Sequence, residues 1–192
     1  MHRLIARCLE RDEGIEADPE AVVVTVGCQE AMFLVLRALR SDDRDVLLSV
    51  SPMYVGLTGA ARLTDMPVLP VAGGAAGIDM DDLVAQIRAA RQRGQRPRAC
   101  YVMPDFANPS GLSMDLATRR ALLEVAEREG ILLLEDNPYG LFHRARRHRP
   151  RSRRWTPAAR WSTSGRWPRR YCPAPGSATW WRTSWCVTRR AG

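Results

Sequence analysis

Residues 131–140 read ILLLEDNPYG, an apolar run that ends in two acids and then enters a turn. A short apolar run bounded by turn residues is typical of a buried strand, so we predict a strand over Ile131 to Glu135. Asp136 directly follows that strand, where a carboxylate is costly to bury without a cationic or hydrogen-bonding partner. Asp136 is therefore the residue that is least easily explained as structure alone.

Upstream of this segment, apolar runs alternate with amphipathic stretches. The runs that predict strands are Ala21–Val26, Val46–Val50, Val68–Val71 and Ala99–Met103. Helical spacing of apolar residues predicts helices over Gln29–Arg40, Asp79–Arg93 and Asp115–Glu129, and a further helix over the first residues. Strands that are apolar throughout and separated by helices indicate a three-layer α/β fold with a mostly parallel sheet covered on both faces. Ligands in such folds bind at the carboxyl ends of the strands.

Two of these strand ends carry residues that suit a bound anion or a flat ring. Gly27, Cys28 and Gln29 open a helix, where free backbone amides and the helix dipole attract a group such as phosphate. A glycine at this place is also common in βα units that bind nothing. Tyr54, in the sequence SPMY, either stacks on a flat cofactor or packs on the next helix.

The fourth strand is followed by the turn-rich sequence PDFANPSG, residues 104–111. Asn108 in that segment either donates a hydrogen bond to a ligand oxygen or caps a turn. The four strand ends therefore form a set of candidate ligand-binding loops at one edge of the sheet.

Taken together, four segments resemble the class I, fold type I aminotransferases that use pyridoxal phosphate, in the branch of the aminoadipate and kynurenine enzymes. The segments are VGCQEAM, SPMYVG, PDFANPSG and LLLEDNPYG, in that order along the chain. The resemblance covers roughly Arg3 to Arg144 and implies a partial large domain over residues 1–144. Some of these loops resemble aminotransferases that make hydroxyphenylglycine and dihydroxyphenylglycine for peptide antibiotics.

The resemblance implies a role for each matching residue. Groups around Gly27, Cys28 and Gln29 would hold the cofactor phosphate, and Tyr54 would stack on the pyridine ring. The departure at Cys28, where relatives often have serine or alanine, is mild.

For the other matching residues, the resemblance implies contacts with the polar atoms of the ring. Asn108 and Tyr139 would hydrogen-bond its phenolic oxygen. Asp136 would pair with the protonated pyridine nitrogen, which keeps the ring an effective electron sink.

The family also needs a lysine that bonds covalently to the cofactor as a Schiff base and moves the substrate proton. The 192 residues contain no lysine, so the expected catalytic residue is absent and we predict that the printed chain is inactive. Relatives also begin with an N-terminal arm and a first helix that precede this sequence, which favours a chain cut at both ends.

Residues 145–192 have a different composition from the rest. All 21 acidic residues lie at or before Asp136, and residues 1–143 carry 15 arginines against them, a balance of −6. The 6 tryptophans all lie after Arg144, and Val187 is the only Val, Leu, Ile, Met or Phe residue there. We therefore predict an unstructured basic tail that supplies no strand and no core. A nucleic-acid-binding arm is the less favoured alternative.

A sharper hypothesis is that the tail is translated out of frame. When the third base of each codon is read with the first two of the next, residues 160–183 can encode VVYLGSLAKTVLPGARVGYVVAD with synonymous codons chosen freely. That string resembles the missing family segment, and its lysine codon would straddle Pro168 and Arg169. Some positions leave no choice, since Trp180 followed by Trp181 forces valine.

Composition excludes several other classes of protein. No apolar run approaches the roughly 18 to 20 residues that span a bilayer, and we expect a cytoplasmic protein without membrane partners. The 5 cysteines lie far apart, which argues against a disulfide framework and against a metal site.

The expected partners are an α-amino acid and a 2-oxo acid. Relatives of this fold are homodimers, whereas the segments missing here argue against that assembly. Two alternative functions remain open at this point: the aminotransferase-like effector domain of a transcription regulator, and a pyridoxal phosphate enzyme of another reaction type.

Overall fold

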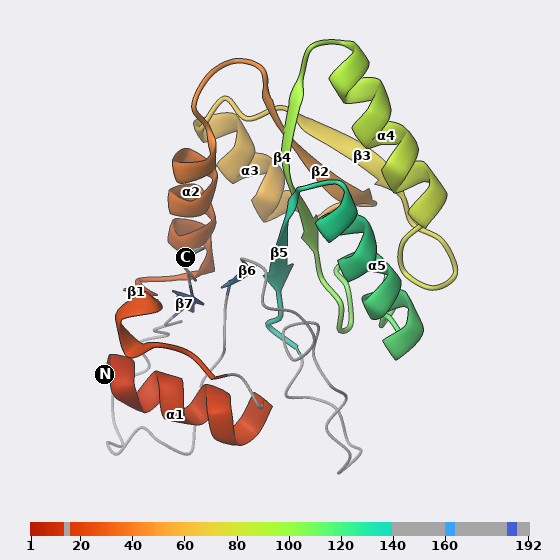
Figure 1. Cartoon of the computed structure of the whole chain (residues 1–192). Helices are drawn as coiled ribbons and strands as arrows, with labels where there is room; N and C mark the ends of the chain where they lie inside the picture. The colour runs from red at the N-terminus through yellow and green to blue at the C-terminus, as the bar shows by residue number, and fades with distance from the viewer. Residues whose placement is uncertain (14–15, 140–159, 164–183, 188–192) are drawn as a thin grey trace.

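The computed structural model describes residues 1–13, 16–139, 160–163 and 184–187 (Figure 1). Its helices are α1 His2–Glu13, the short 3-10 helix η1 Pro19–Ala21, α2 Cys28–Leu39, α3 Val55–Leu63, α4 Met80–Gln92 and α5 Leu116–Arg128. Its strands are β1 Val22–Thr25, β2 Asp45–Ser51, β3 Val68–Ala72, β4 Arg96–Val102, β5 Leu132–Asp136, β6 Arg160–Thr163 and β7 Ser184–Val187. The five strands predicted before residue 140 are confirmed, with shifts of a few residues at their ends.

The strands form one sheet in the order β1-β7-β6-β5-β4-β2-β3. The pairs from β3 to β6 are all parallel, and only β7 runs antiparallel to its neighbours β6 and β1. The predicted three-layer α/β fold with a mostly parallel sheet is therefore confirmed. The carboxyl ends of β2, β4 and β5 lie next to one another at one edge.

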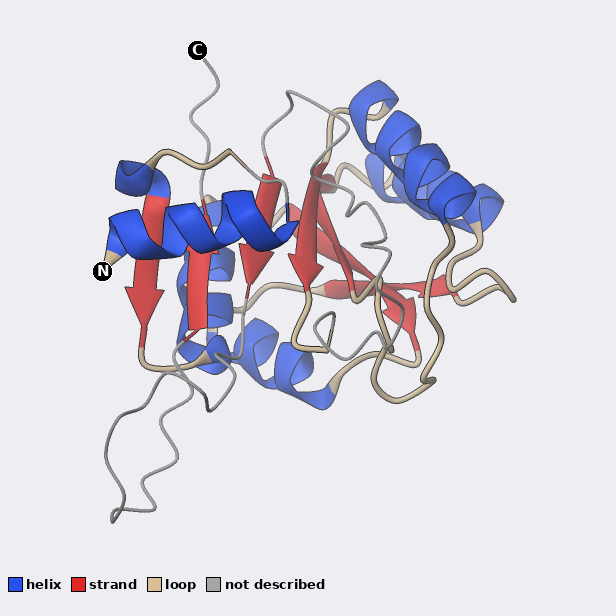
Figure 2. Ribbon diagram, turned by 90° about the horizontal axis from the view of Figure 1, so that it is seen from below, coloured by secondary structure: helices blue, strands red, loops and turns tan. Residues whose placement is uncertain are grey.

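Helices cover the two faces of the sheet (Figure 2). Adjacent residues of β2 show that both faces of the sheet are covered. Leu47 packs with residues of α2 and α3, while Leu48 packs with residues of α4 and α5. Successive side chains of a strand point to opposite faces, so a strand covered on both sides is mostly apolar. The first helix packs separately, through Ile5 and Leu9 against Val22 of β1.

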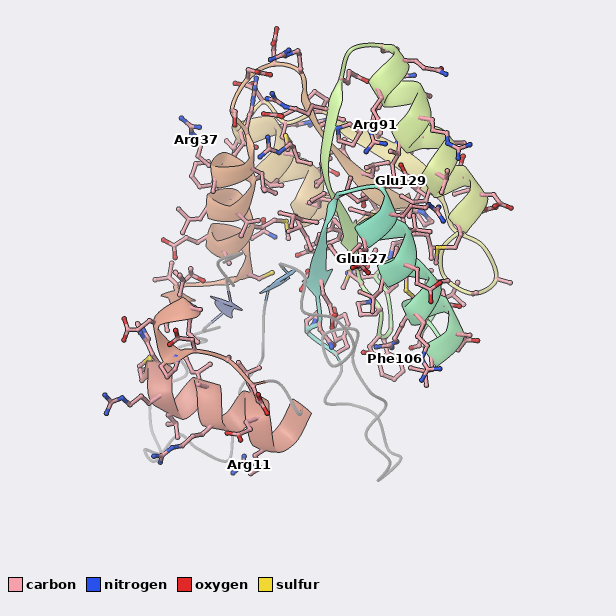
Figure 3. The ribbon with its side chains drawn as sticks, in the orientation of Figure 1. Arg11, Arg37, Arg91, Phe106, Glu127 and Glu129 are labelled. Atoms are coloured by element: carbon pink, nitrogen blue, oxygen red, sulfur yellow. The ribbon has the colours of Figure 1, made fainter. Side chains whose placement is uncertain are left out.

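Polar contacts fix the helices at their ends. Asp79 caps α4 by accepting from two backbone amides, and Asp115 caps α5 by accepting from Thr118 N at 2.7 Å. Arg91 of α4 and Glu129, just after α5, form an ion pair of 2.8 Å that links the two helices (Figure 3). These contacts hold α4 and α5 in place on one face of the sheet.

The amino end of β2 holds a fully buried carboxylate, that of Asp45. Arg96 Nε donates to it at 2.7 Å and Arg98 at 3.4 Å, and the amides of Ser41 and Asp42 donate at 2.6 and 3.1 Å. Burial raises the pKa of Asp45, but these hydrogen bonds outweigh burial and hold the pKa below its ordinary value. Asp45 is therefore a charged structural residue of the core.

The prediction that the tail supplies no strand is wrong at two short places. β6 pairs parallel to β5, and β7 pairs with β6 and β1, although both segments are almost devoid of aliphatic residues. Strand pairing uses backbone N–H and C=O groups, which every non-proline residue carries, so it does not require apolar side chains. The rest of the predicted tail lies outside the described residues. Within the described ranges, no helix is both long and apolar enough to cross a membrane.

Candidate cofactor site

Asp136 ends β5 at the carboxyl edge of the sheet, and its side chain is only 1% exposed. The hydroxyl of Tyr101, on the neighbouring strand β4, donates to Asp136 Oδ2 at 2.6 Å. The thiol of Cys28, the first residue of α2, lies 3.8 and 3.9 Å from the two carboxylate oxygens. Cys28 and Asp136 are 108 positions apart in the sequence, so the fold brings two of the predicted site residues together.

The amino end of α2 differs from those of α4 and α5 because its N-cap residue is Gly27, which has no side chain to donate or accept. The first amides of a helix have no partner within the helix, and the helix dipole adds partial positive charge there. Gln29 is exposed at this end, and Glu30 turns back to accept from Val26 N at 2.7 Å. The predicted phosphate-binding residues therefore lie at a helix end whose geometry suits an anion.

Tyr54 lies just before α3 and is partly buried. Gln29 Nε2 donates to the Tyr54 hydroxyl at 3.3 Å. A residue predicted to hold the phosphate thus contacts the residue predicted to stack on the ring. The tyrosine ring also lies over Gly56, where an added Cβ would come within 2.4 Å of Tyr54 Cε1. A larger residue at position 56, which was not among the residues predicted from the sequence, would therefore have to shift both the side-chain amide of Gln29 and the Tyr54 ring.

Asn108 is exposed and lines a cavity of about 80 Å³ together with Tyr54 and Tyr101. Nearby, Tyr139 is partly buried and packs, like Cys28 and Tyr54, against the apolar cluster between the sheet and α2 and α3. All seven predicted residues therefore lie on segments that meet at the carboxyl edge.

A buried ion pair shapes the loop that carries Asn108. Arg119 of α5 is 2% exposed, and its guanidinium donates to Asp105 Oδ1 at 2.7 Å and to Pro104 O at 2.9 Å. Asn137, directly after Asp136, donates to Asp105 Oδ2 at 3.4 Å. This network connects the loop after β4, which also carries Phe106 (Figure 3), to the end of β5.

The electrostatics of the edge keep Tyr101 protonated. Burial raises the pKa of the Tyr101 hydroxyl well above its ordinary value, and the neighbouring Asp136 carboxylate raises the pKa further. Tyr101 therefore acts as a hydrogen-bond donor to Asp136 at neutral pH. The sequence analysis did not single out Tyr101, although a buried tyrosine hydroxyl within an apolar strand must find a partner.

These groups match the polar atoms of pyridoxal phosphate. A buried carboxylate can accept from a protonated ring nitrogen, an aromatic side chain held by Gly56 can stack on the ring, and the helix end can receive the phosphate. The donor set at this edge therefore fits the cofactor that the sequence motifs imply.

Comparison with known proteins places this geometry in context. The sequence model described as "Aminotransferase class I and II" matches residues 1–154. The chain is 66% identical over 139 residues to (S)-3,5-dihydroxyphenylglycine transaminase of Amycolatopsis orientalis, covering 72% of this chain and 32% of that protein. It is 35% identical over 127 residues to 2-aminoadipate transaminase of Thermus thermophilus, covering 66% and 30%. The chain thus spans about a third of the length of these relatives.

Solved structures show the same fold. An archaeal alanine:glyoxylate aminotransferase superposes with a TM-score of 0.86 at 24% identity, over 98% of this chain and 45% of that one. The kynurenine aminotransferase of Pyrococcus horikoshii superposes with a TM-score of 0.78 at 21% identity, over 97% and 44%. At these identities the likeness concerns the fold alone.

Proposed function

The chain belongs to the class I and II aminotransferases, the family that its four sequence motifs predict, and from that premise we propose that it derives from an enzyme that moves an amino group between an α-amino acid and a 2-oxo acid. Homologues in this family use pyridoxal phosphate. When bound, this cofactor supplies an electron sink for the electron pair at the substrate α-carbon.

One observation carries the proposal: a 1% exposed carboxylate, Asp136, lies against the first residue of α2 at the carboxyl edge of the sheet. That arrangement suits a ligand with a cationic ring nitrogen at one end and an anion at the other. In the proposed site, Asp136 accepts from the ring nitrogen, and the amides around Gly27, Cys28 and Gln29 hold the phosphate. Both assignments rest on the chemistry of the groups.

The remaining residues orient the ring. Tyr54, fixed by Gly56 and by the amide of Gln29, is proposed to stack on one ring face. Asn108 and Tyr139 are proposed to hydrogen-bond the phenolic oxygen. The Asp105–Arg119 pair positions the loop that carries Asn108 and so restricts where that amide can lie.

For the substrate, we propose an aromatic amino acid of the arylglycine type. The support is the 66% identity to (S)-3,5-dihydroxyphenylglycine transaminase over 139 residues of this chain. The aminoadipate relative is only 35% identical over a similar span, which makes an arylglycine the better choice of first substrate.

The chain has no lysine, so no group is present to bond covalently to the cofactor or to move the α-proton as the family requires. We propose that residues 1–144 are a partial cofactor-binding domain, and that residues 145–192 are read out of frame from the codons of the lysine-bearing segment. The support is the alternate reading of residues 160–183, a segment that lies beyond the family match over residues 1–154. The printed chain should then bind pyridoxal phosphate without catalysing amino transfer.

The test is to sequence the gene through the codons of residues 139–160 and beyond, and to express the protein in the repaired frame. We expect the repaired enzyme to transfer the amino group of (S)-3,5-dihydroxyphenylglycine to a 2-oxo acid. A gene whose reading frame is continuous through these codons would refute the frameshift. An active pyridoxal phosphate enzyme without amino transfer would instead support the alternative of another reaction type.

Two further assignments are proposals of the same kind. A cytoplasmic location is supported by Cys8 and Cys100, which are free cysteines. A homodimer is proposed for the repaired enzyme, and its mass in solution would decide it.

A further inference from the structure

Tyr101 lies outside the set of residues that the sequence motifs assign to the site, yet it makes a short hydrogen bond to the central carboxylate. Its hydroxyl donates to Asp136 Oδ2 at 2.6 Å, and its side chain is 4% exposed. A hydrogen bond to an ionised acceptor is shorter and stronger than one between neutral groups. The contact therefore stabilises the carboxylate form of Asp136 over the carboxylic acid form.

The register of the sheet explains why tyrosine is needed at this position. Tyr101 pairs with Leu134 across β4 and β5, and Asp136 lies two residues further along β5 on the same face of the sheet. A side chain on β4 must therefore reach diagonally toward the carboxyl edge to meet the carboxylate. The length of the tyrosine side chain spans that offset, whereas serine or threonine would be too short.

Cys28 is a weaker partner of Asp136 than Tyr101 is. Its thiol lies 3.8 Å from the same oxygen, and a thiol is a weak hydrogen-bond donor. Asp136 from β5, Cys28 from α2 and Tyr54 from the segment before α3 all favour the protonated hydroxyl of Tyr101. Of the hydroxyl and the thiol, the Tyr101 hydroxyl is therefore the stronger donor to Asp136.

We propose that Tyr101 is a positioning residue that, through its hydrogen bond to Asp136, keeps the shared proton on the pyridine nitrogen of bound pyridoxal phosphate. Without that hydrogen bond the carboxylate becomes more basic, and the proton moves from the ring nitrogen toward Asp136. An unprotonated ring withdraws electrons less strongly, so the position of this proton sets how well the site serves the chemistry. The inference rests on the proposed function, because it requires that the cofactor binds at this edge.

The experiment uses the full chain with pyridoxal phosphate labelled with ¹⁵N in the ring. The ring nitrogen resonance, read in the pH range where it does not change with pH, gives the ratio of proton on the nitrogen to proton on Asp136. In the Tyr101→Phe variant, we expect this ratio to fall about tenfold, the equivalent of one pKa unit. Thr64→Val is the matched control, because it also removes a buried hydroxyl that donates, here to Ala60 O at 3.0 Å in α3. The control should give the ratio of the parent chain.

A variant with 3-fluorotyrosine at position 101 keeps the shape and the hydroxyl but donates more strongly, so the ratio of nitrogen-bound to Asp136-bound proton should rise. This second variant decides the question if Tyr101→Phe does not fold, as judged by circular dichroism. A parent chain that binds pyridoxal phosphate, with a ratio that neither change at Tyr101 moves, overturns the inference and leaves the proposed function standing. A parent chain that binds no pyridoxal phosphate overturns the proposed function, and the inference falls with it.

Discussion

Two buried aspartates lie at opposite edges of the same sheet, and their surroundings differ. Asp45, at the amino end of β2, is held by the guanidinium groups of Arg96 and Arg98, the nearer at 2.7 Å. Asp136, at the carboxyl end of β5, accepts from the hydroxyl of Tyr101 and lies beside the thiol of Cys28. Cationic partners neutralise a carboxylate within the fold, whereas a hydroxyl and a thiol stabilise it without cancelling its charge. The amino edge thus uses its acid for stability, and we propose that the carboxyl edge presents its acid to a cationic ligand.

The largest expected effect concerns the amino edge. Asp45→Ala should lower the free energy of unfolding by about 3 kcal/mol, because the part-buried hydrogen bonds from the amides of Ser41 and Asp42 and from two arginines lose this buried acceptor. Asp45→Asn keeps one acceptor oxygen and should cost less. Urea unfolding measures both values, and a loss of under about 0.5 kcal/mol for Asp45→Ala would remove the structural role assigned to this carboxylate.

A smaller effect should appear in the pH dependence of stability. The fold lowers the pKa of Asp45, so its stabilising contribution is complete above the unfolded-state pKa near 4 and is lost as pH falls toward the folded-state pKa. Between pH 5 and pH 3 we expect the parent chain to lose about 1 kcal/mol more than the Asp45→Asn variant. Stability is measured by urea unfolding at each pH, and a loss in the parent chain equal to or smaller than that of the Asp45→Asn variant would contradict this prediction.

The smallest expected effect is on ligand affinity at the carboxyl edge. Gly56→Ala places a Cβ within 2.4 Å of the Tyr54 ring, and we expect the affinity for pyridoxal phosphate to fall about threefold, or roughly 0.6 kcal/mol. Gly59→Ala is the matched control in the same helix, since nothing lies within 4 Å of its added Cβ. Both changes favour helix formation. Equal affinities of the two variants in an absorbance titration would therefore show that Gly56 does not determine the position of the Tyr54 ring.

The sequence predicted the features that follow from periodicity. The strand over residues 131–135 and the acid after it were correctly placed, because an apolar run with a terminal carboxylate leaves few alternatives. Candidate residues such as Cys28 and Asp136 were correctly placed at one edge, because parallel strands align their carboxyl ends.

The missed features depend on register and on contacts between distant segments. In the sequence, Tyr101 cannot be told from the apolar residues of its strand, and only its pairing with β5 shows that its hydroxyl lies near Asp136. The salt bridge from Arg119 to Asp105 connects a helix to a loop, and no pattern in either segment predicts it. The strands β6 and β7 pair antiparallel to each other, and composition does not reveal this pairing because every non-proline residue carries the backbone groups that it uses.

The most direct test of the central claim is an absorbance titration of the full 192-residue chain with pyridoxal phosphate, beside its Asp136→Ala and Asp45→Asn variants. We expect saturable binding by the parent chain and by any Asp45→Asn protein that remains folded. For Asp136→Ala we expect affinity about a hundredfold weaker, or roughly 2.7 kcal/mol. A folded parent chain that gives no spectral change, or an Asp136→Ala variant that binds as tightly as the parent, would contradict it.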